Sequence, residues 1–222
     1  MTKNSVRRSA RLLGAGLRAL LVLTLVCGVL YPLTVTGVAQ ALFPDQAGGS
    51  ETRDAQGRVV GSALIGQRYD LPGEAGEEPR PDPRWFQPRP SRGLGTNTVN
   101  TWYDLLLSGA TNRSGDNPEL IAWVKAAKAA VVRENSTATY RLRPADVPPD
   151  AVTSSGSGLD PHISPAYAAL QVHRVAERNG LSVRQVEELV ARHTEGRTLG
   201  FLGEPRVHVL GLNTALRDLA RK

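Results

Sequence analysis

Residues 19–44 contain no Asp, Glu, Lys or Arg, and most of their side chains are apolar. A helix needs about 20 such residues to cross the hydrocarbon core of a bilayer. The apolar region of a cleaved signal peptide is shorter, at about 7–15 residues, although Ala39-Gln40-Ala41 resembles a signal-peptide cleavage site. Pro32 is compatible with a span because proline is tolerated in membrane helices. We therefore expect a permanent transmembrane helix at residues 19–43, and a cleaved signal peptide is the alternative.

Five basic residues and no acidic residue precede this apolar stretch; the basic residues are Lys3, Arg7, Arg8, Arg11 and Arg18. Segments rich in Lys and Arg next to a span stay on the cytoplasmic side of the membrane. We therefore expect residues 1–18 to form a basic cytoplasmic tail and residues 44–222 to form an extracytoplasmic domain. The tail also carries most of the formal net charge of +6. A nucleic-acid-binding protein needs its basic excess on the folded part, so we expect no nucleic-acid partner.

The hydrophobic content of 41% is sufficient for a packed core, and we expect a mixed α/β (α+β) extracytoplasmic domain anchored by the single N-terminal span. Alternating apolar residues and glycines predict a strand over residues 59–67, where the glycines indicate bulges or close contacts. A second alternating pattern predicts a strand over residues 205–210. Prolines mark residues 71–90 as a loop, in which Trp85-Phe86 forms an apolar anchor.

Helix-capping signals predict four helices in the same domain. An Asn or a Ser followed by proline begins two of them, and a Ser-x-x-Gln capping box begins a third. The expected bounds are, in order, Asn117 to Ser136, Ser164 to Gly180, Ser182 to a point near Gly196, and a last helix capped by Asn213.

The most unusual segment of the domain is Ser-Ser-Gly-Ser-Gly-Leu-Asp-Pro-His-Ile-Ser-Pro, residues 154–165. Its hydroxyls, glycines, carboxylate and imidazole suggest four kinds of site: a metal site, a hydrolase site, a phosphate-binding loop or a rigid joint. No two histidines of the chain have the spacing that places two ligands on one helix face, and the chain has no P-loop motif. Ser157 and His162 suit a hydrolase only if folding brings them together, because Gly156-Ser157-Gly158 lacks the strand-turn-helix frame of a nucleophile elbow.

A rigid joint explains most of the composition of this segment. Gly156 and Gly158 allow unusual backbone dihedrals, and Pro161 and Pro165 restrict the chain as it enters the next helix. We therefore interpret the segment as a rigid, polar recognition joint that a partner protein contacts, while an anion or nucleotide contact stays open. We expect no catalytic residue and no metal ligand here, and the candidate contact residues for a partner or a nucleotide are Ser155, Gly156, Ser157, Gly158, Asp160 and His162.

Further short motifs follow one another along the chain: Tyr31-Pro32-Leu33, Phe43-Pro44, Gln46-Ala47-Gly48-Gly49-Ser50, Ile65-Gly66-Gln67, Arg89-Pro90-Ser91, Gln171-Val172, His193-Thr194-Glu195-Gly196-Arg197 and Leu202-Gly203-Glu204-Pro205-Arg206-Val207. Together with residues 154–165, and in this order, they resemble the KdpC family, which comprises the C subunits of the Kdp potassium-transporting P-type ATPases. The resemblance covers nearly the whole chain and adds Gln171 to the candidate contact residues. Residues 71–84, 94–107 and 108–118 depart from the family's pattern.

This resemblance implies a non-catalytic subunit of a complex that imports K⁺ at the expense of ATP. In that family a channel-like subunit selects the ion and a P-type ATPase subunit hydrolyses ATP. The C subunit helps to assemble the complex and acts as a catalytic chaperone that raises the affinity of the pump subunit for ATP. The resemblance thus implies these two subunits and membrane lipid as partners, in the plasma membrane of a bacterium.

We expect no tightly bound cofactor, since the complex carries K⁺ and ATP acts through the pump subunit. Because the basic tail places the domain outside the cytoplasm, we expect any effect on ATP to be transmitted through the span and the complex. The alternative function is a membrane-anchored or secreted hydrolase that uses Ser157 and His162.

Overall fold

The computed structural model describes residues 3–72, 80–91, 108–109 and 112–221. The chain forms two compact units, Met1–Ser50 and Glu51–Lys222. Residues 94–107, one of the segments that depart from the family pattern, lie outside the described part of the chain.

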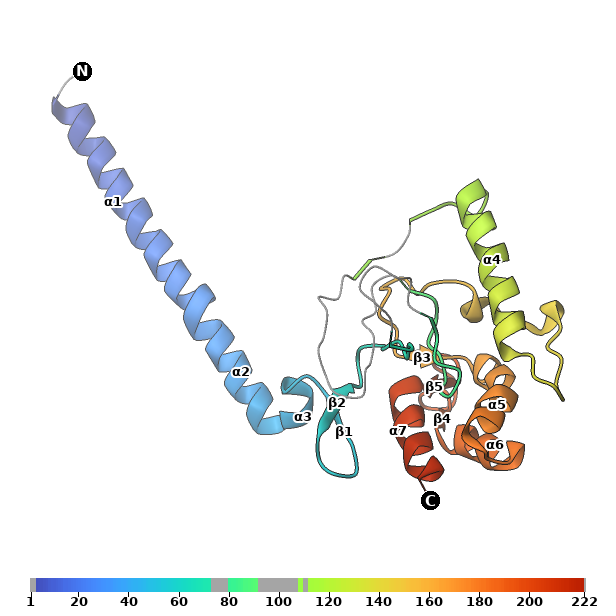
Figure 1. Ribbon diagram of the computed structural model, residues 1–222. Coiled ribbons are helices and arrows are strands. Elements are labelled where there is room, and N and C mark those ends of the chain that lie inside the picture. Colours follow the sequence, from blue (N-terminus) through green and yellow to red (C-terminus); the bar gives the residue numbers. More distant parts are fainter. Residues whose placement is uncertain (1–2, 73–79, 92–107, 110–111, 222) are drawn as a thin grey trace. The chain divides into compact units, whose positions relative to one another are not determined.

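The first unit is mainly helical, with α1 (Lys3–Leu25), a π-helical turn η1 (Val26–Leu30) and α2 (Tyr31–Leu42) continuing into one another (Figure 1). Pro32 has no N–H to donate to the carbonyl group of Gly28, and the wider π-helical turn immediately before it accommodates the missing bond. A short helix, α3 (Pro44–Ala47), follows.

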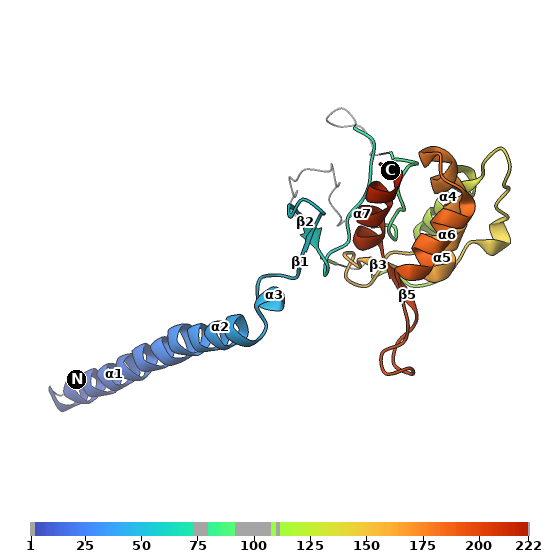
Figure 2. The same ribbon diagram turned by 90° about the horizontal axis from the view of Figure 1, so that it is seen from below.

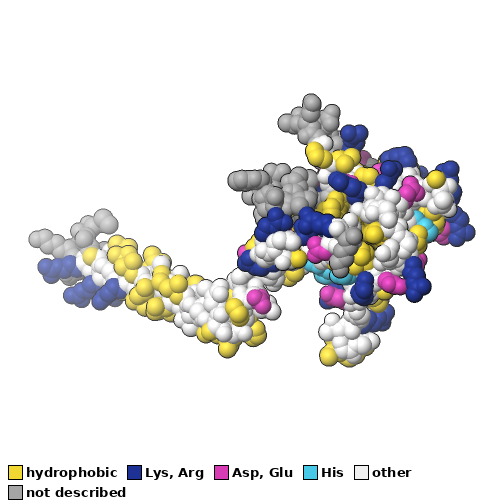
Figure 3. Space-filling model, turned by 60° about the horizontal axis from the view of Figure 1, so that its bottom comes forward, with side chains coloured by type: hydrophobic (Ala, Val, Ile, Leu, Met, Phe, Trp, Pro, Cys, Tyr) yellow, Lys and Arg dark blue, Asp and Glu magenta, His cyan; other side chains and the backbone are white. Residues whose placement is uncertain are grey.

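Within this unit, Arg7–Leu42 is a helix of 36 residues that is long and apolar enough to cross a membrane. Figure 3 shows dark blue basic side chains toward the N-terminal end of this helix and hydrophobic side chains further along it. The expectation of one long apolar N-terminal helix is confirmed by length and composition. The side of the membrane on which each flank lies stays a prediction, as does the division at residues 18 and 43.

The second unit begins with a two-stranded antiparallel sheet of β1 (Glu51–Arg53) and β2 (Val59–Ser62). The expected strand at residues 59–67 ends earlier, because the Ser62 hydroxyl accepts a hydrogen bond from the Leu64 N–H at 3.1 Å and the chain turns there. The expected close contact at a glycine is present, since a Cβ atom on Gly61 would lie 2.1 Å from Gln67 Nε2.

A three-stranded antiparallel sheet has the strand order β3 (His162–Ile163), β5 (Arg206–His208), β4 (Thr194–Glu195). It lies among four helices: α4 (Pro118–Asn135), α5 (Pro165–Asn179), α6 (Val183–Arg192) and α7 (Val209–Ala220) (Figures 1 and 2). Two short 3₁₀ turns, η2 (Pro144–Asp146) and η3 (Pro149–Ala151), connect α4 to β3. The side chains of Phe86, Val175, Val186, Val207, Leu212 and Leu216 form the most buried part of the core. The mixed helix-and-sheet class is confirmed, and Phe86 is the expected anchor.

Three of the expected helix starts are confirmed by their side-chain caps. Asn117 accepts from two N–H groups at the start of α4, Ser164 accepts from the Tyr167 N–H at the start of α5, and Ser182 with Gln185 forms the capping box of α6. Gly180 ends α5 in the left-handed conformation, with φ of 66°.

Two helix bounds were wrong. Helix α6 ends at Arg192 rather than near Gly196, because Thr194 and Glu195 leave the helix to pair with Val207 and Arg206 of β5. Asn213 does not cap the last helix, which begins at Val209 with His208 as its cap. The side chain of Asn213 is instead buried inside the domain, where it bonds to the backbone of Phe86.

Candidate functional site

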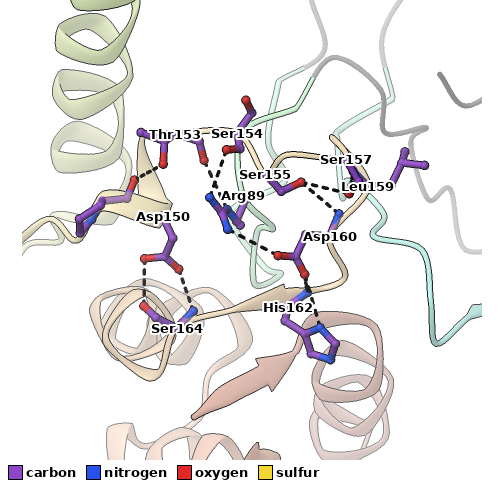
Figure 4. A network of polar contacts seen from close by, with 11 residues as sticks. Arg89, Asp150, Thr153, Ser154, Ser155, Ser157, Leu159, Asp160, His162 and Ser164 are labelled. Atoms are coloured by element: carbon purple, nitrogen blue, oxygen red, sulfur yellow. Dashed lines mark hydrogen bonds and ion pairs between the residues drawn. The ribbon is translucent and has the colours of Figure 1, made fainter. Parts of the chain in front are cut away.

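Arg89 holds the polar loop that precedes β3. Its guanidinium donates to the Thr153 carbonyl at 3.4 Å and to the Ser154 carbonyl at 3.1 Å, and it lies 3.5 Å from the Asp160 carboxylate (Figure 4). One side chain thus connects both ends of residues 153–160. Sequence reasoning missed this role, because Arg89 is 71 residues away from Asp160 and no local pattern marks the contact.

Asp160 fixes the chain as it enters β3. Its carboxylate accepts a hydrogen bond from the His162 N–H at 2.9 Å and lies 3.4 Å from His162 Nδ1. The hydrogen bond from the His162 side chain and the charge of Arg89 lower the pKa of Asp160 below its ordinary value, although partial burial opposes them. Asp160 is therefore an anion at neutral pH that is already paired within the loop.

Two of the three serine hydroxyls of the loop, those of Ser155 and Ser157, bond to the loop itself. Ser155 Oγ accepts from the Asp160 N–H at 3.4 Å and lies 3.4 Å from Ser157 Oγ, which accepts from the Leu159 N–H at 3.1 Å. Ser155 is buried whereas Gly156 and Ser157 are exposed. The surface that the loop offers to another molecule is therefore centred on Gly156 and Ser157.

The two glycines of the loop have different roles. Gly158 has φ of 70°, and a Cβ atom there would lie 3.0 Å from the Gly109 carbonyl oxygen. The Gly158 carbonyl oxygen also accepts a hydrogen bond from the Ser91 hydroxyl. Gly156 has an ordinary backbone conformation with open space around it. The expectation of unusual dihedrals is thus right for Gly158 and wrong for Gly156.

A third glycine brings a distant segment against the loop. The Gly66 N–H donates to the Leu159 carbonyl at 2.8 Å, and a Cβ atom on Gly66 would lie 2.5 Å from the Asp160 carbonyl oxygen. This approach is possible only for a residue without a side chain. Gly66 of the Ile65-Gly66-Gln67 motif therefore packs directly against the polar loop within residues 154–165.

Asp150, in η3, clamps the C-terminal end of the segment. Its two carboxylate oxygens accept from the Ser164 N–H at 2.7 Å and from the Ser164 hydroxyl at 3.0 Å. The same hydroxyl oxygen caps α5 by accepting from the Tyr167 N–H at 3.0 Å. The segment is therefore held at both ends, and it enters α5 in one fixed direction.

His162 lies against the ring of His208, not against the loop serines. The two ring centroids are 5.4 Å apart, and His208 Nδ1 accepts from the Gly211 N–H at 3.2 Å to cap α7. Burial and the neighbouring charge of His162 lower the pKa of His208. In the described part of the chain no hydrogen bond joins Ser157 to His162, so the geometry gives no support to the hydrolase alternative.

Gln171 lies away from the loop, on α5, and is fully buried. Its Oε1 atom accepts from the Gln87 N–H at 2.7 Å, and its Nε2 atom donates to the Gln87 carbonyl at 3.1 Å. The Arg174 guanidinium also donates to Gln171 Oε1 at 2.7 Å. Gln171 thus positions the backbone two residues before Arg89, and through it the loop.

Arg174 is a buried cation whose hydrogen-bond partners are all neutral. Its guanidinium donates to Asn135 Oδ1 at 2.9 Å and to the carbonyls of Pro83 at 2.5 Å and Trp85 at 3.0 Å, besides Gln171. Burial lowers the pKa of Arg174 to about 10, so the side chain remains charged at neutral pH. None of these partners is a carboxylate that could neutralise the charge of Arg174.

A pocket of about 480 Å³ lies beside Gln171 and Arg174. Its lining includes three further arginines, Arg80, Arg133 and Arg178, and one carboxylate, Glu134. The lining is therefore electropositive, and an anion is the kind of ligand that it would attract. No short sequence motif indicated this pocket, because its arginines come from three separate segments of the chain.

The family model of the K⁺-transporting ATPase c chain, KdpC, matches residues 13–218. A protein of Streptomyces avermitilis named potassium-transporting ATPase KdpC subunit is 69% identical over 217 residues, which are 97% of this chain and 97% of that protein. A protein of the same name from Streptomyces coelicolor is 67% identical over 97% of this chain and 96% of its own length. One from Kineococcus radiotolerans is 47% identical over 92% of each chain.

Proposed function

The chain belongs to the KdpC family of K⁺-transporting ATPase subunits, and we propose that it is a non-catalytic subunit that holds a channel-like, potassium-selecting subunit together with a P-type ATPase subunit. Family membership makes it an accessory subunit of the Kdp complex. The identity of the two partners, the absence of catalysis in this chain and the assembly role are the parts that we propose.

We also propose an orientation for the chain. The basic side chains at the N-terminal end of the long apolar helix support a cytoplasmic N-terminus, because such residues rarely cross the membrane. The helix then contacts membrane lipid, and Glu51–Lys222 lies on the outer face, where it meets the partner subunits. K⁺ moves through the complex and not through this domain.

The observation that carries the assembly role is the rigid joint at residues 153–164. Arg89, Asp150 and Gly66 fix its backbone, and Ser155 and Ser157 accept from the N–H groups of Asp160 and Leu159. Gly156 and Ser157 remain exposed at its surface. A preorganised surface loses little conformational entropy when it docks, which suits a contact made once, when the complex assembles.

The test is to co-express the full chain with both partner subunits and to measure the recovered complex and its K⁺-stimulated ATPase activity. Gly156→Phe should reduce both, because the large ring would project from the exposed joint without backbone strain. Gly115→Phe is the matched control, since Gly115 also has open space and an ordinary backbone conformation. Normal complex recovery and activity with Gly156→Phe would rule out the joint as the assembly surface.

We further propose that the chain raises the affinity of the pump subunit for ATP through the span and the complex, without touching ATP. The proposed orientation supports this route, because ATP is cytoplasmic. Direct contact is the second candidate, and the electropositive pocket beside Gln171 favours it. If nucleotide bound there, the exposed Arg133 and Arg178 would be the residues that reach its phosphates.

The two routes give different results with Arg133→Gln/Arg178→Gln. Under the transmitted route, the complex with this variant keeps the KM for ATP of the wild type, and a fluorescent ATP analogue does not bind the purified full chain. Saturable binding of the analogue that the double variant abolishes, together with a raised KM, would establish direct contact and overturn the transmitted route.

A further inference from the structure

Residues 196–205, which connect β4 to β5, project from the domain as a protruding hairpin (Figure 2). Every one of these residues is exposed. Three large apolar side chains gather at its end: Leu199 is 79% exposed, Phe201 69% and Leu202 49%. Figure 3 shows hydrophobic side chains at the end of a protrusion at the bottom of the view. We call Leu199, Phe201 and Leu202 the apolar tip.

The hairpin has a defined structure despite its exposure. Thr198 and Leu202 exchange two backbone hydrogen bonds, each of 2.9 Å. Leu199 has φ of 54°, a left-handed conformation that leucine rarely adopts. Such a strained position persists only where the surrounding structure imposes it, and it is commonest at binding and switch sites. The hairpin therefore presents the tip in a defined conformation, in which Leu199 keeps a strained backbone angle.

Exposed apolar side chains of this size are otherwise isolated in the described part of this unit. Leu64 and Ile121 are the remaining large exposed hydrophobic residues there, and they lie in a turn and at the start of α4. Single exposed apolar residues are normal on protein surfaces, whereas a contiguous apolar group marks an interaction site. The tip is therefore the strongest apolar contact point that the described residues of this unit display.

The charges around the tip favour a protein over an anionic lipid surface as its partner. Arg197 pairs with Glu204 at 2.7 Å, and Arg206 pairs with Glu195 at 2.9 Å. These pairs neutralise the hairpin, so it has no excess positive charge with which to hold lipid headgroups. The hairpin also lacks Trp and Tyr, the residues enriched at membrane interfaces.

We propose that the apolar tip inserts into an uncharged, apolar pocket on another protein subunit of the K⁺-transporting ATPase. The inference rests on the proposed assembly function and adds a second contact to it, separate from the joint at residues 153–164. A rigid aromatic and aliphatic group that enters a partner's pocket is the usual form of an interface hot spot.

Two variants of the full chain test the proposal by co-expression with the partner subunits. Leu199→Gly removes an apolar side chain at a position whose positive φ suits glycine, and Phe201→Ser removes the ring. Neither side chain packs in the core, so the melting temperature should be unchanged or, for Leu199→Gly, slightly higher. We expect recovery of the complex to fall about tenfold for Phe201→Ser, as for loss of a hot spot. Ile121→Ser, at the exposed start of α4, is the matched control and should recover normally.

A photoreactive phenylalanine analogue in place of Phe201 identifies the partner. Irradiation of membranes that contain the whole complex should produce an adduct between this chain and a partner subunit, while the same analogue in place of the exposed Glu188 on α6 should not. Adducts exclusively with lipid, or exclusively with a second copy of this chain, would overturn the proposal.

Omission of the chain separates the two proposals. If an active complex forms without this chain, the assembly function itself is wrong. If omission abolishes the complex while Leu199→Gly and Phe201→Ser both assemble as well as the wild type, the assembly function stands and the docking role of the tip is refuted.

Discussion

Gln171 on α5 pairs with the backbone of Gln87, which lies 84 residues earlier in the chain, through both its amide oxygen and its amide nitrogen. Asn213 on α7 pairs in the same way with the backbone of Phe86. Two buried side-chain amides thus satisfy the N–H and carbonyl groups of Phe86 and Gln87. The next residues carry Arg89 to the polar loop, so the position of the loop depends on these core amides.

Gln171→Leu should destabilise the domain by about 2–4 kcal/mol, because it leaves both Gln87 backbone groups and one Arg174 donor without their partner in a buried place. Chemical denaturation of the full chain, followed by tryptophan fluorescence, measures this cost. Gln56→Leu makes the same change on an exposed turn and should alter the free energy of unfolding little. An equally small effect at position 171 would show that the amide pairing does not hold the segment.

Gly158→Ala and Gly156→Ala should differ in stability although the two residues are only two positions apart. Alanine at position 158 must adopt a positive φ and also crowds the Gly109 carbonyl, so we expect a loss of about 1–2 kcal/mol or more. Alanine at position 156 meets neither obstacle, so its effect should lie within about 0.5 kcal/mol of zero, as for ordinary surface substitutions. Denaturant midpoints of the two variants, measured side by side, check the prediction, and equal losses would contradict it.

Stability should fall as the pH drops below about 6.5, which is the ordinary pKa of histidine. His208 accounts for part of this loss. Burial lowers its pKa in the folded protein, so below pH 6.5 the unfolded chain binds more protons than the folded chain and is favoured. Protonation also places a hydrogen on the Nδ1 atom that caps α7.

His208→Asn keeps a side-chain acceptor at this cap but does not titrate. The shift in melting temperature between pH 7.5 and pH 5.5 should therefore be smaller for this variant than for the wild type. Identical shifts would assign the pH dependence to other groups. Asp160 does not interfere in this range, because its lowered pKa places its own contribution at a more acidic pH.

The N-terminal helix should remain attached in the mature protein. Its apolar stretch is longer than that of a signal peptide and is preceded by basic residues. Intact-mass analysis of protein extracted from membranes checks this expectation. A mature chain that begins at Leu42 would establish cleavage, and the orientation argued from a permanent span would then lose its basis.

Three of the four helix starts and the apolar span were predictable from the sequence because each depends on neighbouring residues. Asn117, Ser164 and Ser182 cap helices through N–H groups two or three positions away, and Gly180 ends a helix with its own φ angle. The amino-acid types therefore carry the information. The same holds for the uncharged run of residues 19–44, whose length alone decides what it can span.

The arrangement of the candidate site was decided by the tertiary structure. Arg89 reaches Asp160 across 71 residues, and Gln171 reaches Gln87 across 84. Asn213 was expected to cap a helix, yet a buried backbone 127 residues away uses its side chain. A buried polar side chain forms hydrogen bonds with whichever backbone group the packed core places beside it. Local sequence patterns do not show which group that is. The sequence by itself thus determined most of the local elements and the family, while long-range packing decided which distant residues hold the joint and that Gly156 and Ser157 are exposed at its surface.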